Sequence, residues 1–212
     1  DDKLRAAIRR DGGENDSPSR NLSRWIARLA NGDLAVRQVW RADRMGRGGD
    51  HLPFEELGYP AVRLSVAVEN YEHQHQDLRV ENGVRFGDTI ERMDFAYLAK
   101  VTRLNVRALA GLARAPIAPT ATTQAAVQTF TDVAWTAVPG AVGYKVWRRR
   151  TDQSAWETRP IARTSEARAN LPGLRGDDWF LGVSAIAADG SESPIASAVP
   201  GGGFDKTAAP AR

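Results

Sequence analysis

The sequence predicts a layered α/β region followed by a small β-sandwich. Helical and alternating apolar patterns succeed one another in the first half, and a segment rich in Pro, Ala and Thr then interrupts them. Short strand-like stretches between turn residues fill the rest of the chain. A chain of 212 residues has room for one or two domains. We therefore expect residues 1–113 to form one domain, 114–122 a linker, 123–200 the sandwich and 201–212 a loosely held tail.

The α/β region is expected to begin with a helix and a strand. The helix is predicted at about residues 19–30, because apolar residues recur at helical spacing after the cap residues Ser17-Pro18-Ser19. Asn31-Gly32 ends that pattern. Residues 34–40 then alternate apolar and polar side chains, as a half-buried strand does.

Two more helices and a second strand are expected further along. A short helix near residues 52–57 precedes an apolar strand over 59–66. A long amphipathic helix is predicted from Asp94, whose carboxylate is placed to cap it, to about Leu112. Because helices and strands alternate, the pattern favours a sheet covered by helices.

Composition and charge exclude several classes of function. Lys and Arg number 29 against 26 Asp and Glu, a net charge of only +3, and the longest basic run is Arg148-Arg149-Arg150, so we expect no nucleic-acid partner. The absence of cysteine excludes thiol catalysis, disulfides and cysteine-bound zinc, so any metal must bind through His, Asp or Glu. No apolar run approaches the ~20 residues that cross a bilayer.

The three histidines all fall between positions 51 and 75. Two of them, His73 and His75, lie in a polar stretch over residues 69–77, directly after an expected strand, and α/β proteins place their sites at strand ends. A neutral imidazole oriented by a carboxylate is suited to bind zinc. The alternative is that both rings are merely solvated.

The segment from Gly48 to Val62, the histidine loop after it and the later Gly87-Asp88-Thr89 resemble the C-terminal part of an M28-family zinc peptidase, over about residues 14–112. The resemblance implies a partial α/β/α layer domain of an aminopeptidase-like hydrolase. Members of that family hydrolyse peptide bonds with a co-catalytic pair of zinc ions. The loop after the strand delivers the last histidine ligand of that pair.

The resemblance assigns roles to particular residues. It places the terminal zinc ligand at His75, with His73 as the fallback. It places Asp50, His51 and Asp88 near the zinc pair or the substrate without binding metal. Arg47 precedes the Asp-His turn, where some members carry an aromatic hydroxyl that stabilises the oxyanion, and it would supply a hydrogen-bond donor there. The alternative for Arg47 is a solvated side chain. The alternative for His51 is that it caps a helix and bonds to backbone.

The sequence also departs from the M28 pattern. An early histidine, a bridging aspartate, an adjacent Glu-Glu pair at a strand end and a further aspartate ligand are not recognisable, and Glu55-Glu56 falls inside an expected helix. At most one zinc ligand then lies in this chain, which we expect to be inactive alone, since a catalytic zinc takes about three protein ligands. The chain would be a piece of a longer reading frame, a processed chain whose N-terminal partner supplies the other ligands, or a degenerate relative.

The later part of the chain resembles a fibronectin type III module over about residues 117–200. Residues 133–148 are similar to its strands B and C, and 185–194 to its F–G hairpin. The resemblance implies that Trp135 is the buried core tryptophan. Five more side chains should alternate into the same core: Tyr144, Val146, Trp179, Leu181 and Val183.

Trp147 and Trp156 allow two interpretations. They form an exposed aromatic platform for sugar or peptide, or they cover a face of the sheet. The run Arg148-Arg149-Arg150 is expected to be a solvated strand end.

Two functions from different classes follow. The first is the C-terminal portion of an exported zinc exopeptidase, secreted or periplasmic, that acts on peptides and needs the N-terminal part of its domain. The second is a non-catalytic binding or adhesion fragment, in which the α/β region is only a scaffold and the sandwich is the interaction module.

Overall fold

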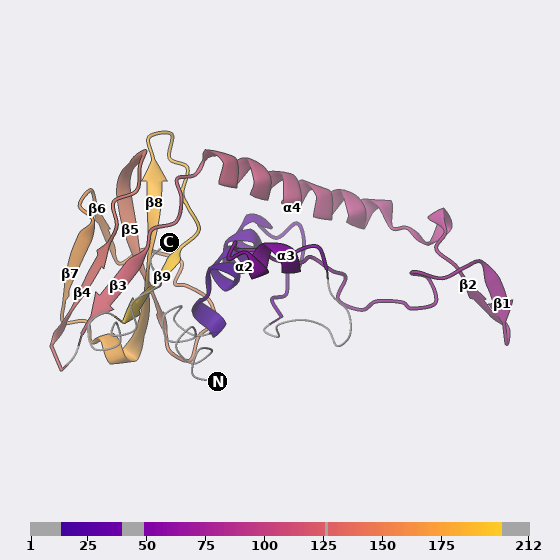
Figure 1. Ribbon diagram of the computed structural model, residues 1–212, viewed down its shortest axis with the longest axis horizontal. Coiled ribbons are helices and arrows are strands. Elements are labelled where there is room, and N and C mark those ends of the chain that lie inside the picture. The colour runs from indigo at the N-terminus through magenta and orange to yellow at the C-terminus, as the bar shows by residue number, and fades with distance from the viewer. Residues whose placement is uncertain (1–13, 40–48, 126, 201–212) are drawn as a thin grey trace.

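The computed structural model describes residues 14–39, 49–125 and 127–200. The expected tail over 201–212 and the candidate residue Arg47 lie outside these ranges. Figure 1 shows the β-rich part at one end of the molecule and helix α4 running away from it toward a small hairpin at the other end. Helix α2 lies below α4 in this view, beside the β-rich part.

The three helices expected from the sequence are present. Helix α2 spans Pro18–Leu29, and the hydroxyl of Ser17 caps it by accepting a hydrogen bond from the Arg20 N–H at 3.3 Å. Helix α3 spans Leu52–Glu56. Helix α4 spans Phe95–Arg114, and the Asp94 carboxylate accepts from the Tyr97 N–H at 2.9 Å, as the cap prediction requires. The described residues also contain three 3-10 turns: η1 Glu14–Asp16, η2 Ile90–Arg92 and η3 Gly176–Asp178.

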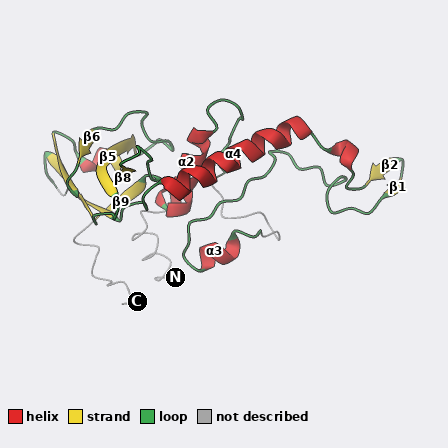
Figure 2. Cartoon of the chain, turned by 90° about the horizontal axis from the view of Figure 1, so that it is seen from above, coloured by secondary structure: helices red, strands yellow, loops and turns green. Residues whose placement is uncertain are grey.

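The two strands expected in the α/β region are not formed. Residues 35–39 and 59–66 belong to no strand, and the strands described before residue 115 are β1 (Arg79–Glu81) and β2 (Val84–Phe86), which make an antiparallel hairpin (Figure 2). A strand requires backbone hydrogen bonds from a neighbour, and no described segment supplies them at 35–39 or 59–66. The predicted layered sheet is therefore absent from the described residues.

Seven strands follow α4 in the part of the chain that the structure describes. They are β3 Ala121–Gln124, β4 Phe130–Trp135, β5 Ala141–Arg150, β6 Ala162–Thr164, β7 Arg168–Pro172, β8 Trp179–Ala187 and β9 Ala196–Pro200. The hydrogen-bonded order is β6-β5-β8-β9-β3-β4-β7, and all pairs are antiparallel except β3 with β9. Side chains from both ends of this order meet in one core, so the strands fold over as a sandwich, as the turn-punctuated pattern predicts.

The core of the sandwich is built around Trp135. This ring is 7% exposed and meets Tyr144 edge to face, with ring centroids 5.2 Å apart. Val146, Leu181 and Val183 pack into the same cluster, and Trp179 packs against it while half-buried. The expected core alternation along β5 and β8 is confirmed.

A second cluster joins α2 to α4. Ile26 and Ala30 of the α2 region pack against Leu104 and Ala108, and Val62 lies against them from the extended segment. The approach is close, because a side chain at Gly111 would come within 2.8 Å of the Trp25 ring. Charged side chains interrupt even α4, the longest described helix, and no helix in the described ranges meets the requirements of a membrane span.

Candidate functional site

The Asp50-His51 turn forms one wall of a shallow hollow. The hollow measures about 380 Å³ and is lined by Gly49, Asp50 and His51 on one side and by residues 62–64 on the other. His51 occupies the N-cap position of α3 but makes no side-chain capping bond. Its Nδ1 is buried and has no hydrogen-bond partner among the described atoms. The alternative role for His51, a cap bonded to backbone, is thus wrong for its side chain.

Glycine at position 49 keeps this turn close to the histidine. A Cβ there would lie 2.9 Å from the Nδ1 of His51 and 3.3 Å from the Cδ of Arg63. These distances leave no space for a side chain unless the imidazole moves. The chain therefore packs its backbone directly against the His51 ring, with the exposed Asp50 beside it.

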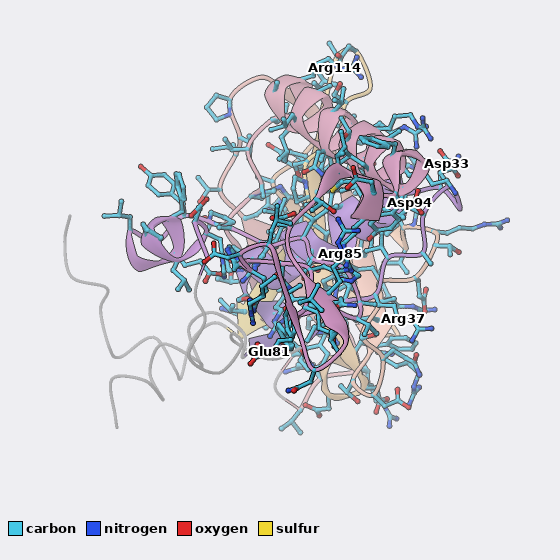
Figure 3. The ribbon with its side chains drawn as sticks, turned by 90° about the vertical axis from the view of Figure 1, so that its right-hand side faces the viewer. Asp33, Arg37, Glu81, Arg85, Asp94 and Arg114 are labelled. Carbon is cyan, nitrogen blue, oxygen red and sulfur yellow. The ribbon has the colours of Figure 1, made fainter. Side chains whose placement is uncertain are left out.

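The histidine loop and the Gly87-Asp88 segment come together. The Gly87 N–H donates to the Glu72 carbonyl at 3.0 Å, which closes a loop that contains the β1–β2 hairpin. Figure 3 views the molecule from this end, with Glu81 and Arg85 of the hairpin labelled. Asp88 follows this junction directly and is exposed. The backbone thus joins two candidate segments that are separated in sequence.

The two histidines of this loop differ in their surroundings. His73 is half-buried, and its N–H donates to the Asn70 carbonyl at 3.2 Å. His75 is exposed and has a φ of 56°, the left-handed region that non-glycine residues seldom adopt. The backbone turns sharply at His75 and presents its imidazole to solvent.

The described residues do not by themselves make a zinc site. In the ranges 14–39, 49–125 and 127–200, no three His, Asp or Glu side chains gather as a metal-binding group. Zinc takes about four ligands, of which about three come from the protein at a catalytic site. Glu55, of the Glu-Glu pair, is exposed on α3.

The structure decides between the two interpretations of Trp147 and Trp156, and it corrects the expectation for the arginine run. Trp147 and Trp156 are 2% and 8% exposed, so they do not form an open platform but cover a face of the sheet. Arg149 is 2% exposed and pairs with Asp16, so the middle of the arginine run is not solvated. Arg149 is two residues from Trp147 in a strand, so strand periodicity placed both on one face. Only the position of α2 reveals what covers them.

Comparisons with known proteins show that the chain is similar in sequence to curated proteins named probable zinc metalloproteases. No family model matches it. A probable zinc metalloprotease of Leptosphaeria maculans is 39% identical over 200 residues, which cover 90% of this chain and 45% of the relative. A second, of Pyricularia oryzae, is 36% identical over 211 residues, covering 94% of this chain and 41% of the relative.

Among solved structures, a Fn3-like protein from Clostridium thermocellum aligns with 41% of this chain and 90% of its own, at 22% identity and a TM-score of 0.33. The chain spans less than half the length of the curated relatives named above. Over about nine tenths of its own length, the chain is homologous to proteins named probable zinc metalloproteases.

Proposed function

We propose that this chain is the C-terminal part of a zinc-dependent exopeptidase of the M28 type, aminopeptidase-like, that hydrolyses peptide bonds with a co-catalytic metal pair. The observation that carries the proposal is the homology of nine tenths of the chain to proteins named probable zinc metalloproteases. The chain spans 45% of the first of these relatives, which leaves room for further ligands elsewhere. Hydrolysis then requires ligands from the rest of a longer protein, because the described residues alone do not gather three.

Within this proposal, His75 supplies one zinc ligand. Its imidazole is exposed, and the loop that carries it is held to Gly87, whose backbone N–H donates a hydrogen bond to the carbonyl of the nearby Glu72. The half-buried His73 is less available to a metal that approaches from outside this chain. Asp50, His51 and Asp88 are proposed to lie near the metal pair or the substrate.

Replacing His75 with Ala in the longer protein should lower bound zinc and peptide hydrolysis by more than the ~10–100-fold typical of changes in residues that only support a ligand. His73→Ala is the matched control, since it removes the same imidazole from the same loop, and its effect should be much smaller. Metal analysis and a peptidase assay on both variants decide the matter. Equal small losses would mean that neither residue is a ligand, and a larger loss at position 73 would assign the ligand to His73.

Apolar side chains left exposed also support a longer parent protein. One face of α4 buries Leu104 and Ala108, while other positions of the same helix carry Phe95, Val106 and Leu109 at 58%, 59% and 69% exposure. The extended segment after α3 adds Val66 and Val68. Contiguous apolar surface is uncommon on a complete monomer. We propose that the rest of the peptidase domain covers these side chains.

The 212-residue chain alone should therefore bind a hydrophobic dye such as ANS, with a fluorescence increase that the longer protein lacks. Leu109→Ser should reduce the signal while changing the free energy of unfolding by no more than about 0.5 kcal/mol, as is usual for surface substitutions. Equal dye binding by the chain and the longer protein would contradict the proposed cover.

The sandwich is proposed to be a fibronectin type III-like module. Its support is the observed topology, in which side chains from both ends of the seven-stranded order share one core and β3 lies parallel to β9. The burial of Trp147 and Trp156 argues against the alternative of an adhesion fragment that binds through an aromatic platform. A secreted or periplasmic location is part of the same proposal.

A further inference from the structure

Helix α2 is too short to be stable by itself. It has 12 residues, and isolated helices below ~12–15 residues are marginal in water even with favourable sequences. Its fold must therefore depend on what it packs against. One side meets α4 through Ile26. Two of its three buried residues, Asn21 and Arg24, are polar. Asn21 donates a hydrogen bond to the Ser197 hydroxyl, and Arg24 donates one to the Ser154 carbonyl.

The contact between α2 and the sandwich is centred on a buried ion pair. The Arg149 guanidinium on β5 donates from Nη2 to Oδ1 of Asp16 at 2.5 Å, and the two side chains are 2% and 3% exposed. Asp16 ends the 3-10 turn η1, immediately before the Ser17 cap of α2. The pair therefore joins the start of α2 to a strand 133 residues away in sequence.

Both charges are held by further partners. The Arg149 guanidinium lies 4.1 Å from the ring centroid of Phe180 and 5.3 Å from that of Trp156, and its Nη1 donates to the Gln153 carbonyl at 2.7 Å. Asp16 also accepts from the Ser197 hydroxyl at 2.9 Å. Ion pairs out of water cost desolvation energy unless additional hydrogen bonds offset it. Here Nη1 and Nη2 of Arg149 are both hydrogen-bonded, while its Nε has no hydrogen-bond partner among the described atoms.

Asn21 extends this network onto the helix itself. Its Nδ2 donates to the Ser197 hydroxyl at 2.9 Å, and its Oδ1 accepts from the Trp156 indole at 3.2 Å. Arg24 donates from Nε to the Ser154 carbonyl and from Nη1 to Asn21. Burial, followed by repulsion from Arg149, lowers the pKa of Arg24 to about 10. We call Asp16, Asn21, Arg149, Trp156 and Ser197 the polar clamp.

We propose that the sandwich is an intramolecular docking partner for α2, and that α2 keeps its helical fold only while the polar clamp holds it on the outer face of β5, β8 and β9. Directional hydrogen bonds select one orientation, which an apolar contact alone would not do. The occupant of this face is therefore a segment of the same chain rather than a sugar or peptide. Through Ile26 and Val62, the same helix reaches the segment that lines the His51 hollow.

Hydrogen exchange on the 212-residue chain tests the proposal. Asp16→Ala leaves the Arg149 guanidinium buried without its carboxylate, so the amides of α2 should exchange at least about tenfold faster. Amides in the middle of β5 and β8, at Val146 and Val183, should change much less. Asn21→Leu removes the central side-chain amide of the polar clamp without removing a charge. The amides of α2 should again exchange faster while those of β5 and β8 change little. This second variant keeps the test valid if Asp16→Ala fails to fold.

Asp33→Ala is the matched control. Asp33, labelled in Figure 3, makes an exposed ion pair with Arg107 at 3.0 Å between the end of α2 and α4. Its loss should leave exchange in α2 within about twofold, because exposed pairs contribute little. The proposal is overturned if α2 exchanges in Asp16→Ala and Asn21→Leu as slowly as in the native chain. It is also overturned if α2, Val146 and Val183 all accelerate by the same factor, because the network would then stabilise the sandwich in general.

Discussion

Trp135→Ala is expected to lower the free energy of unfolding of the sandwich by about 3–5 kcal/mol, the range for removing a buried aromatic side chain. Trp135 is 7% exposed and contacts the core from β4, opposite Tyr144 of β5. Loss of the indole removes apolar contacts from both halves of the sandwich and leaves a cavity that the strands cannot close. Its Nε1 has no hydrogen-bond partner among the described atoms, so the substitution breaks no hydrogen bond there and the expected loss comes from packing.

Denaturant unfolding followed by circular dichroism measures the effect. Val142→Ala, on β5 and 59% exposed, is the control and should change the free energy of unfolding by no more than about 0.5 kcal/mol. A loss at Trp135 below about 1 kcal/mol would mean that the tryptophan does not carry the core.

Local signals in the sequence predicted the regular elements well. The Asp94 carboxylate and the Ser17 hydroxyl cap α4 and α2 as expected, because capping depends on groups only three residues apart. The alternation of Tyr144 and Val146 into the core follows from the two-residue period of a strand. Predictions of this kind need no knowledge of distant partners.

Expectations that depended on distant partners were less successful. Residues 34–40 and 59–66 have strand-like patterns, but no described segment pairs with them through backbone hydrogen bonds. An alternating pattern predicts a strand only where such a partner exists. Arg149 looked like part of a solvated run, because its partner Asp16 lies far away in sequence. The interpretation in which Trp147 and Trp156 cover a face of the sheet is confirmed, but the sequence did not reveal that Arg28 and Asn21 of α2 contact them.

In the candidate site, too, local features could be predicted from the sequence, and features that depend on distant partners could not. The sequence singled out the turn at His51, the histidine loop and Gly87-Asp88, and the structure joins the last two through the bond from Gly87 to Glu72. His75 is exposed and adopts a left-handed backbone conformation. The spacing of apolar residues in the sequence does not predict such a conformation. The roles of His75 and Asp88 at a metal stay predictions, since they depend on ligands outside the described residues.

Gly182→Ala is expected to destabilise the chain by about 1–3 kcal/mol, as overpacking of a well-filled core does. Gly182 lies in the middle of β8, where it pairs with Trp147 on one side and Ser197 on the other. An added Cβ would lie 2.6 Å from Ile195 Cγ2, 2.8 Å from Trp156 Cη2 and 2.9 Å from the Ala196 carbonyl oxygen. The carbonyl belongs to a paired strand and cannot move without loosening β9 from β8.

Gly143→Ala provides the matched comparison, because it makes the same change in the adjacent strand β5. There the nearest atom to an added Cβ is the Thr164 carbonyl oxygen at 3.5 Å, an ordinary van der Waals distance. Glycine in a strand interior costs roughly 0.5–1 kcal/mol relative to alanine, so this variant should equal or exceed the native chain in stability. The free energies of unfolding of the two variants, measured by denaturant titration, should therefore differ by at least about 1 kcal/mol. Equal values would refute the close packing of β8 beneath Trp156 and Ile195.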